Sequence, residues 1–193
     1  MKIGAVVLAA GSSTRLGEPK QLLLYQGQTL LRRAAAAALN AGCAPVVVVV
    51  GSERKKIAHS LRGLGIMILP NESWQRGIGT SIRIGVEALA DRDALIILVC
   101  DQPYVGGAFI RQLIARQEET GQPMVASAYA GTLGVPALFV RACFAQLLSL
   151  GDEQGAKALL IRRPNDVAQV DFPAGTVDLD TPEDWARLWM RES

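Results

Sequence analysis

The chain has 193 residues, half of them hydrophobic, and a formal net charge of +2. This length suits one domain with a sizeable core, so we expect residues 1–193 to form a single domain. The small charge, carried by scattered basic residues, argues against nucleic acid or a membrane surface as a partner.

The sequence shows neither a membrane span nor a targeting segment. No uncharged apolar stretch approaches the ~18 residues of a membrane helix. The apolar run after Lys2 is interrupted by Gly11 and polar residues, unlike a signal peptide. We therefore expect a cytoplasmic protein. The cysteines Cys43, Cys100 and Cys143 are odd in number, form no CxxC pair and lie in or beside apolar runs, which favours buried thiols over a metal or catalytic role.

The first part of the chain alternates between strand and helix patterns. Residues 3–8 are apolar and end before Gly11, which predicts a buried strand. Thr29 is a candidate N-cap for a helix that stops near Gly42. The next predicted elements are a strand at 45–50, a helix at 53–61, a strand at 66–69, a helix at 80–89 and a strand at 94–99.

The second part continues the alternation with shorter signals. The Gly-, Ala- and Ser-rich stretch 126–136 is expected to be a loop within the domain. Pro182 is expected at the first position of a final helix, followed by Glu183 and Asp184 in its first turn. The other predicted elements are helices at 108–119, 141–148 and 156–161, strands at 124–126, 167–170 and 176–179, and an extended pair at 138–139.

This alternation predicts an α/β fold: a three-layer α/β/α sandwich whose mostly parallel sheet is covered by helices on both faces. Ligands of such folds bind at the carboxyl ends of the strands. The loops that follow Leu8, Leu69, Val99 and Leu179 are therefore the places to look for a site.

The loop after the first strand reads LAAGSSTRLGEPK over residues 8–20. Small residues allow the backbone to approach a ligand, and amide N–H groups together with the cations Arg15 and Lys20 suit a polyphosphate. The alternative is a polar surface loop with solvated basic residues. The candidate nucleotide-binding residues here are Leu8, Ala9, Ala10, Gly11, Ser12 and Ser13.

Two common nucleotide motifs do not fit this loop. A Walker A loop needs G-x-x-x-x-G-K-[ST], but Lys20 comes three residues after Gly17 and is followed by Gln21. The dinucleotide motif G-x-G-x-x-G needs paired glycines that Gly11 lacks. Gly77 and Gly79 come nearer to it but do not directly follow a predicted strand.

Two carboxylates follow predicted strands and are candidate metal ligands. Asp101 comes just after the strand at 94–99, and Asp180 just after the one at 176–179. Two carboxylates with phosphate oxygens and waters suit octahedral Mg²⁺. The alternative for Asp180 is an N-cap, for which Thr181 competes.

The segment that contains Gly77, Gly79 and Ser81 precedes a predicted helix. Glycines let a base reach backbone groups, and Ser81 adds a hydroxyl, although a flexible connector with a cap has the same pattern. Trp74 is a candidate for stacking on a ligand or for the edge of the core. His59 is the only histidine, which excludes histidine triads and multi-histidine metal sites.

Several of these motifs, in this order, resemble those of the MobA/MocA-like nucleotidyltransferases of molybdenum cofactor biosynthesis. The similarity covers nearly the whole chain and is strongest to the molybdenum cofactor cytidylyltransferases. The blocks that carry it are LAAGSSTRLG with Pro19 and Lys20; Pro70 and Asn71 with Trp74, Gly77, Gly79 and Ser81; DQP at 101–103; GVPALF at 134–139; Gly151 and Asp152 with Gly155 and Ala156; and DLDTPED at 178–184.

The resemblance implies a Rossmann-like nucleotide-diphospho-sugar transferase fold, of the glycosyltransferase-A-like type, and a reaction. A phosphate of the acceptor, expected to be molybdenum cofactor, attacks the α-phosphate of CTP or GTP and displaces pyrophosphate. A phosphate monoester is already ionised near neutral pH, so no strong base is required. The implied roles are catalysis for Lys20 and Arg15, Mg²⁺ binding for Asp101 and Asp180, nucleotide binding for Asn71, Gly79 and Ser81 besides the first loop, and acceptor binding for Gly134 and Pro136.

The acceptor and the class of activity stay open at this point. The cytidylyltransferase branch often carries His where this chain has Val135, which leaves acceptor specificity open. The alternatives are a guanylyltransferase, a sugar- or alditol-phosphate nucleotidyltransferase, and a nucleotide-binding accessory protein that assists the maturation of a molybdenum hydroxylase. The residue set Arg15, Lys20, Asp101 and Asp180 favours an enzyme.

Overall fold

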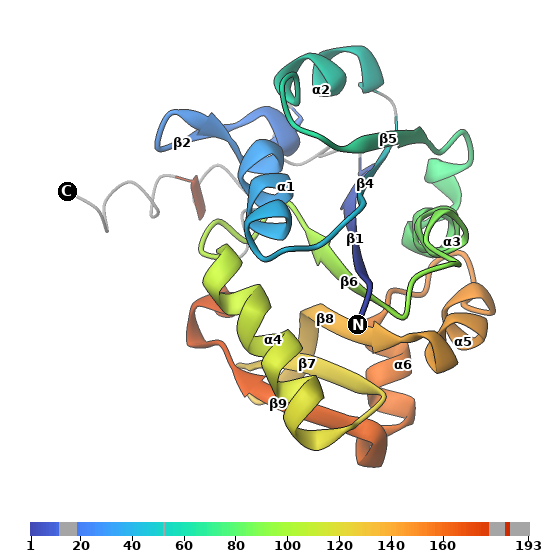
Figure 1. Cartoon of the computed structure of the whole chain (residues 1–193). Coiled ribbons are helices and arrows are strands. Elements are labelled where there is room, and N and C mark those ends of the chain that lie inside the picture. The colour runs from blue at the N-terminus through green and yellow to red at the C-terminus, as the bar shows by residue number, and fades with distance from the viewer. Residues whose placement is uncertain (12–18, 52, 178–183, 186–193) are drawn as a thin grey trace.

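The computed structural model of the protein describes residues 1–11, 19–51, 53–177 and 184–185. Its main sheet has seven strands in the order β5-β4-β1-β6-β8-β7-β9 (Figure 1). The strand β8 runs antiparallel to both of its neighbours, and the other strand pairs are parallel. The strands are β1 (Ile3–Ala9), β4 (Val46–Val50), β5 (Met67–Pro70), β6 (Ala94–Val99), β7 (Met124–Tyr129), β8 (Thr132–Val140) and β9 (Val167–Asp171).

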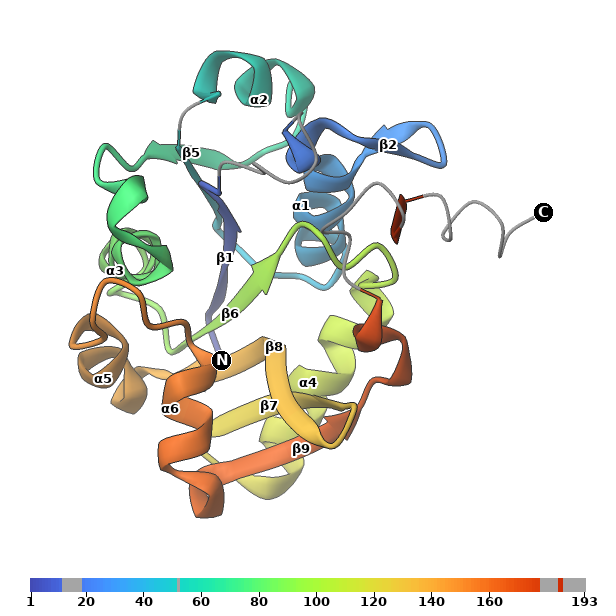
Figure 2. The same cartoon turned by 180° about the vertical axis from the view of Figure 1, so that it is seen from behind.

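Helices cover both faces of this sheet, which confirms the predicted three-layer α/β fold (Figures 1 and 2). One face packs against α1 (Leu30–Asn40), α2 (Arg54–Ser60) and α4 (Gly107–Thr120). The other packs against α3 (Ile78–Ala88), α5 (Phe144–Leu148) and α6 (Lys157–Arg162). Among the described parts of the chain, no helix is both long and apolar enough to span a membrane.

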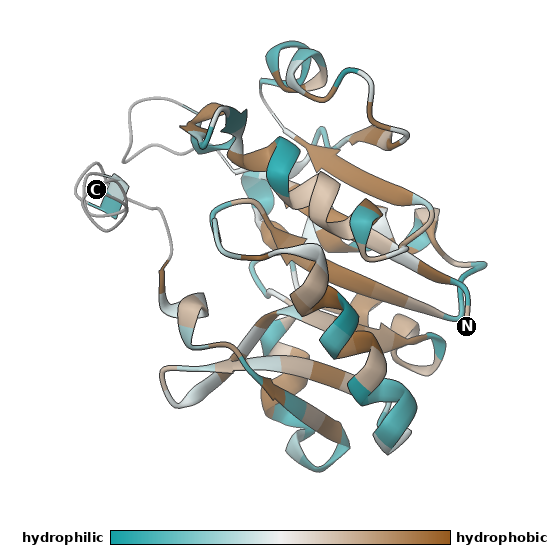
Figure 3. Ribbon diagram, turned by 60° about the vertical axis from the view of Figure 1, so that its left-hand side comes forward, coloured by the Kyte–Doolittle hydropathy of each residue, from teal (hydrophilic) through white to brown (hydrophobic). Residues whose placement is uncertain are grey.

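The valine run of β4 shows why these residues form the centre of the sheet. Val46, Val48 and Val50 belong to the apolar cluster on one face, and Val47 and Val49 to the cluster on the other. Successive side chains of a strand point to opposite faces, so a strand buried on both sides must be apolar throughout. Figure 3 shows that the central strands are predominantly hydrophobic.

The stretch 126–136, expected to be a loop, is instead a β-hairpin, so that expectation was wrong. The strands β7 and β8 extend well beyond the predicted short segments and meet at Ala130 and Gly131, whose φ angles are +49° and +70°. Positive φ at both central residues is typical of a two-residue hairpin turn. The small side chains that indicated a loop permit close packing here, since a Cβ at Gly134 would overlap the Tyr129 hydroxyl.

Two other local features differ from expectation or were missed. The short strands β2 (Leu24–Tyr25) and β3 (Gln28–Thr29) form a hairpin around Gln26 and Gly27, which also have positive φ. The strand expected at 176–179 is not found where the structure describes it, because Pro173–Thr176 is a 3₁₀ helix. Leu179 and Pro182 lie outside the described residues.

The predicted start of α1 is confirmed at Thr29. The Thr29 Oγ1 accepts a hydrogen bond of 3.2 Å from the backbone N–H of Arg32, as an N-cap does. Gly42 follows the helix with φ +88°, a conformation that glycine adopts without a Cβ penalty. The chain then returns to the sheet as β4, and this βαβ unit places the first loop at the carboxyl ends of the strands.

Candidate active site

A cavity of about 360 Å³ lies at the carboxyl ends of β1 and β6. This is the edge at which open α/β sheets bind ligands. Its walls come from the end of β1, the short 3₁₀ helix η1 (Lys20–Leu22), the 3₁₀ helix η2 (Trp74–Arg76), the start of α3 and the end of β6. The lining residues are Leu8, Ala9, Ala10, Gly11, Lys20, Gln21, Trp74, Gln75, Gly77, Ile78, Ser81, Val99, Cys100 and Asp101.

The first loop reaches the cavity through Leu8, Ala9, Ala10 and Gly11, all four of them predicted nucleotide-binding residues. Gln21 fixes the start of this loop, because its Nε2 donates to Ala9 O at 3.0 Å and to Gly11 O at 2.7 Å. Gln21 is only 2% exposed. Sequence reasoning missed this residue, because a glutamine after Lys20 reads as surface. The predicted Ser12, Ser13 and Arg15 lie outside the described residues.

Lys20 and Asp101 form an ion pair in the cavity wall. The Lys20 Nζ lies 2.5 Å from Asp101 Oδ2, and both side chains are less than one-fifth exposed. The pair joins residues that are 81 positions apart in the sequence. The structure therefore brings together a predicted catalytic cation and a predicted metal ligand, beside the small residues of the first loop.

The second carboxylate oxygen of this pair bears on metal binding. Asp101 Oδ1 is buried and has no hydrogen-bond partner among the described residues. Buried carboxylate oxygens are normally satisfied, so an unsatisfied one in a ligand cavity fits a missing donor or cation. Mg²⁺ prefers oxygen ligands and is commonly bound by one or two carboxylates plus substrate phosphates. Asp101 therefore fits such an ion, whereas the predicted second ligand, Asp180, lies outside the described residues.

The described residues contain no cluster of three His, Cys, Asp or Glu side chains that could hold a metal ion.

The pKa of the Cys100 thiol, next to Asp101, is raised to about 12, first by burial and then by the aspartate charge. Burial likewise raises the pKa of Cys43 to about 11. All three cysteines are free and buried, which confirms the expectation of buried thiols. Cys100 is therefore protonated at neutral pH, which argues against a role as a nucleophile.

The predicted nucleotide-binding residues Asn71 and Ser81 lie together beside the cavity. Asn71 is 3% exposed, and its Nδ2 donates to Thr80 Oγ1 at 2.7 Å and to Ser81 Oγ at 2.8 Å. Its Oδ1 accepts from the Ser73 N–H at 2.9 Å. Both amide hydrogens are thus donated within the protein. Asn71 fixes Ser81, whose side chain lines the cavity; contact of either with a nucleotide stays a prediction.

Gly77 and Gly79 have a structural reason to be glycine. A Cβ at Gly77 would overlap the Asp152 carbonyl, and one at Gly79 would overlap that of Gly151. The Gly79 N–H donates to Asp152 O at 2.7 Å. This group is therefore already bonded within the protein. Gly77 lines the cavity, and Gly79 is packed behind it.

Gly51, directly after β4, supports the cavity wall although no sequence motif indicated it. A Cβ there would lie 2.5 Å from Ala10 O and 3.0 Å from Cγ of Trp74. Only glycine lets the first loop and the Trp74 indole approach each other this closely. Trp74 thus forms part of the cavity wall, and its stacking on a ligand stays a prediction.

The structure does not bring Gly134 and Pro136, the predicted acceptor-binding residues, into the cavity lining. Both lie in β8, where Pro136 O accepts a hydrogen bond of 2.6 Å from the buried Ser127 Oγ. Their acceptor role stays a prediction. His59, the only histidine of the sequence, is exposed.

A cavity at the carboxyl edge of the sheet, lined by small residues, a lysine and an aspartate, is the arrangement in which α/β proteins bind phosphorylated ligands. The sequence identifies which kind. The model of the MobA-like NTP transferase domain matches residues 5–167, and the chain belongs to this family of nucleotidyltransferases.

Several known proteins resemble the chain over nearly its whole length, and their names point to different activities. Nicotine blue oxidoreductase of Paenarthrobacter nicotinovorans is 30% identical, with 96% of each chain covered. A nucleotidyl transferase from Methanothermobacter thermautotroptrophicus is 26% identical, with 99% of each chain covered and a TM-score of 0.83. Rv0371C from Mycobacterium tuberculosis, in complex with manganese, is 26% identical and covers 97% of this chain and 98% of its own, with a TM-score of 0.78.

Proposed function

We propose that the chain transfers a nucleoside monophosphate from a nucleoside triphosphate to a phosphorylated small molecule, with release of pyrophosphate. The observation that carries the proposal is the Lys20–Asp101 pair in the wall of the cavity, beside the backbone of the first loop. Membership of the NTP transferase family supports the same reaction.

The reaction does not require a strong general base from the protein. An oxygen of the acceptor phosphate attacks the α-phosphorus, the bond to the bridging oxygen breaks, and pyrophosphate leaves with the electron pair. The attacking phosphate is already ionised near neutral pH. Positioning and charge neutralisation then account for catalysis.

The proposed roles of the residues follow from their chemistry and from the family resemblance. Lys20 neutralises phosphate charge and the charge that develops on the leaving pyrophosphate, together with Arg15. The backbone of residues 8–13 binds the triphosphate, and Ser81 and Asn71 contribute to the nucleoside side, with Gly79 close behind. Gly134 and Pro136 contribute to the acceptor side.

Mg²⁺ is the proposed cofactor, bound by Asp101 and Asp180. When bound, it supplies positive charge that polarises the phosphoryl group. Asp101 Oδ1, which has no partner among the described residues, supports this assignment, as does manganese in the complex of Rv0371C. Lys20 pairs with the other oxygen of the same carboxylate and so orients it.

CTP is the proposed donor and molybdenum cofactor the proposed acceptor, on the resemblance of the sequence motifs to those of the cytidylyltransferases. GTP is the second choice of donor, and a sugar or alditol phosphate the second choice of acceptor. A molybdoenzyme that receives the product is the proposed partner, and the proposed compartment is the cytoplasm. Neither nucleic acid nor a membrane has a role in this proposal.

The experiment that tests this function is a screen for pyrophosphate release. Four nucleoside triphosphates are crossed with molybdenum cofactor, its metal-free pterin and sugar phosphates, in the presence of Mg²⁺. We expect release with one donor and one acceptor, reduced at least about 100-fold in Lys20→Ala. Normal turnover of Lys20→Ala would refute the role of the lysine. Nucleotide binding without release for any acceptor would favour the accessory protein over the enzyme.

A further inference from the structure

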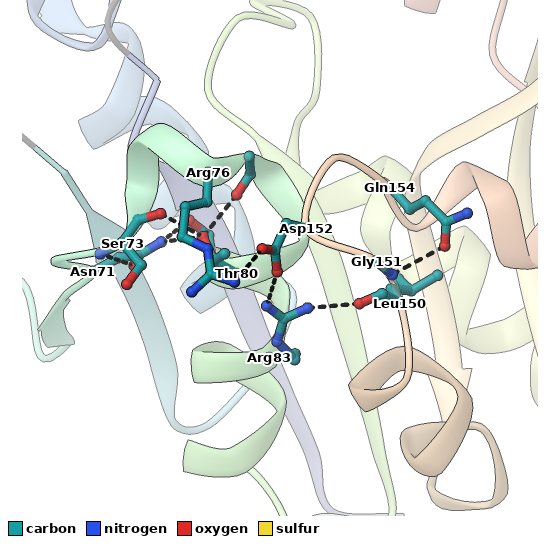
Figure 4. A network of polar contacts seen from close by, with 11 residues as sticks. Asn71, Ser73, Arg76, Thr80, Arg83, Leu150, Gly151, Asp152 and Gln154 are labelled. Carbon is teal, nitrogen blue, oxygen red and sulfur yellow. Dashed lines mark hydrogen bonds and ion pairs between the residues drawn. The ribbon is translucent and has the colours of Figure 1, made fainter.

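The loop between α5 and α6 is joined to the wall of the nucleotide cavity by a polar network that the proposed reaction does not use (Figure 4). The loop contains Gly151, Asp152 and Gln154. The cavity wall that it contacts consists of η2 and the first turns of α3. The two segments are more than 60 residues apart in the sequence, and their contact is both through backbone and through side chains.

The backbone contact is close and specific. Gly77 has φ +129°, a conformation that other residues rarely adopt, and its α-carbon faces the Asp152 carbonyl without room for a Cβ. The Gly79 N–H donates to that same carbonyl oxygen at 2.7 Å. The loop backbone thus takes the first-turn amide of α3, which has no partner inside the helix.

The side-chain contact centres on the carboxylate of Asp152. Its Oδ1 accepts from Arg83, in the middle of α3, and its Oδ2 lies 2.7 Å from the Arg76 guanidinium. Arg83 also donates to Leu150 O at 2.6 Å. The Arg83 hydrogen bond, ahead of the charge of Arg76, lowers the pKa of Asp152, so the carboxylate is ionised at neutral pH. One carboxylate thereby joins η2, α3 and the loop.

The opposite side of the same segment lines the cavity. Gln75, Gly77, Ile78 and Ser81 all contribute to the wall. From the sheet side, Asn71 fixes Thr80 and Ser81. From the outer side, Asp152 fixes Arg76 and Arg83. The wall therefore lies between two sets of polar contacts. Asn71 provides one set from a nearby segment, and Asp152 provides the other from the loop between α5 and α6.

We propose that Asp152 is a positioning residue for the nucleotide: it fixes the wall formed by η2 and α3 and so determines nucleotide affinity without touching the ligand. This inference rests on the proposed function. Asp152 is absent from the cavity lining, so its removal changes the wall and leaves the Lys20–Asp101 pair intact. The effect belongs in binding of the nucleotide, and the chemical step is spared.

The test compares Asp152→Asn, Asp152→Glu and the control Asp166→Asn in the full chain. Asp166 is a similarly exposed aspartate that pairs with Arg163 at 2.6 Å outside the cavity. For Asp152→Asn we expect the Kd and KM of the nucleoside triphosphate to rise about five- to tenfold, with kcat within about twofold, because the charge-assisted hydrogen bonds that hold the wall are weakened and solvent exposure limits the loss. Asp152→Glu restores part of the affinity, and Asp166→Asn leaves it unchanged.

Three outcomes would contradict the inference. An unchanged nucleotide Kd in a folded Asp152→Asn variant would overturn it while leaving the proposed function in place. A lowered kcat with normal Kd would also overturn it, since that result assigns Asp152 to the chemical step. If the wild-type chain binds none of the four nucleoside triphosphates, both the inference and the proposed function fail.

Discussion

The residue with the greatest consequence in the proposed site is Asp101. One of its oxygens pairs with Lys20, and the other is buried without a partner among the described residues. Lys20 and Gln21 come from η1, whereas Asp101 follows β6, and the two segments meet where β1 and β6 are neighbours in the sheet. The neighbourhood of Lys20 and Asp101 is also what distinguishes this cavity from a general apolar pocket.

For Asp101→Ala we predict that transfer falls at least about 1000-fold, while the Kd of the nucleoside triphosphate rises only a few-fold. The reason is that in the proposed mechanism the carboxylate would hold the Mg²⁺ that neutralises charge in the transition state, whereas the first loop would bind the triphosphate. Turnover and equilibrium binding, each measured with and without Mg²⁺, check this. The control is Glu119→Gln, which removes an exposed carboxylate that pairs with Arg116 on α4. Near-normal turnover of Asp101→Ala in Mg²⁺ would refute the metal assignment.

The Cys100 thiol gives a prediction about pH. Its pKa is about 12 in the folded protein, above the ordinary value of 9.0, so the folded state favours the protonated thiol. As the pH rises above 9, the unfolded chain loses the Cys100 proton before the folded chain does. The stability that the raised pKa contributes is therefore complete below pH 9 and is lost as the pH rises towards 12. At pH 8 we expect iodoacetamide to leave Cys100 unmodified in the folded chain and to alkylate it after unfolding in urea, as mass spectrometry of the peptides would show. Rapid alkylation of the folded chain would contradict its burial.

At the scale of elements, the start of α3 depends on a loop that is distant in the sequence. Gly79 shows this dependence most directly, because the space that a Cβ would need is occupied by Gly151 O. Gly155 offers a matched control in the partner loop. Its nearest atom, Cγ2 of Ile78, would lie 3.7 Å from an added Cβ, which is an ordinary contact.

We predict that Gly79→Ala lowers the free energy of unfolding by about 2–3 kcal/mol, through displacement of the loop backbone, and weakens nucleotide binding. Gly155→Ala is expected to change stability by less than about 0.5 kcal/mol. Urea unfolding of both variants checks the difference. Equal stability of the two alanine variants would show that the loop is not packed against α3 as described.

The same elements show what could be predicted from the sequence. The valines of β4 and the cap at Thr29 are local signals, and both led to the correct element. The small residues of 126–136 were misread, because a hairpin with a buried face and a flexible loop have similar composition. For Gly79, the sequence suggested a ligand contact, but the fold supplies Asp152 as the partner of its N–H, and no local pattern encodes a contact across more than 60 residues.

Site residues follow the same division. The place of Lys20, Asp101 and the first-loop backbone at the cavity could be predicted, because small residues and charges at strand ends point to the carboxyl edge of a sheet, whereas their roles stay predictions. Gln21 and Gly51 could not, since each acts on another segment and carries no motif by itself. Gly134 and Pro136 match family motifs, but they lie in β8 outside the cavity lining, so their assignment to the acceptor depends on a ligand complex.

At the scale of the whole molecule, the seven-stranded sheet packs against α1–α6 and carries the cavity at the carboxyl ends of β1 and β6. The βαβ units place the first loop beside Asp101. The antiparallel strand β8 lies between β6 and β7 and so connects the two halves of the sheet. We expect the chain to be a single domain that unfolds in one cooperative transition, with equal calorimetric and van't Hoff enthalpies. Two resolved transitions would contradict a single domain.

The central claim is that the α-phosphate is transferred to an acceptor, and isotope position tests it most directly. The chain is incubated with Mg²⁺, the accepted phosphorylated substrate and nucleoside triphosphate labelled either at the α- or at the γ-phosphorus. We predict that the α label appears in the acceptor product and the γ label in pyrophosphate. Release of the γ label as inorganic phosphate, with the α label left in a nucleoside diphosphate, would contradict nucleotidyl transfer and show hydrolysis at the γ-phosphate instead.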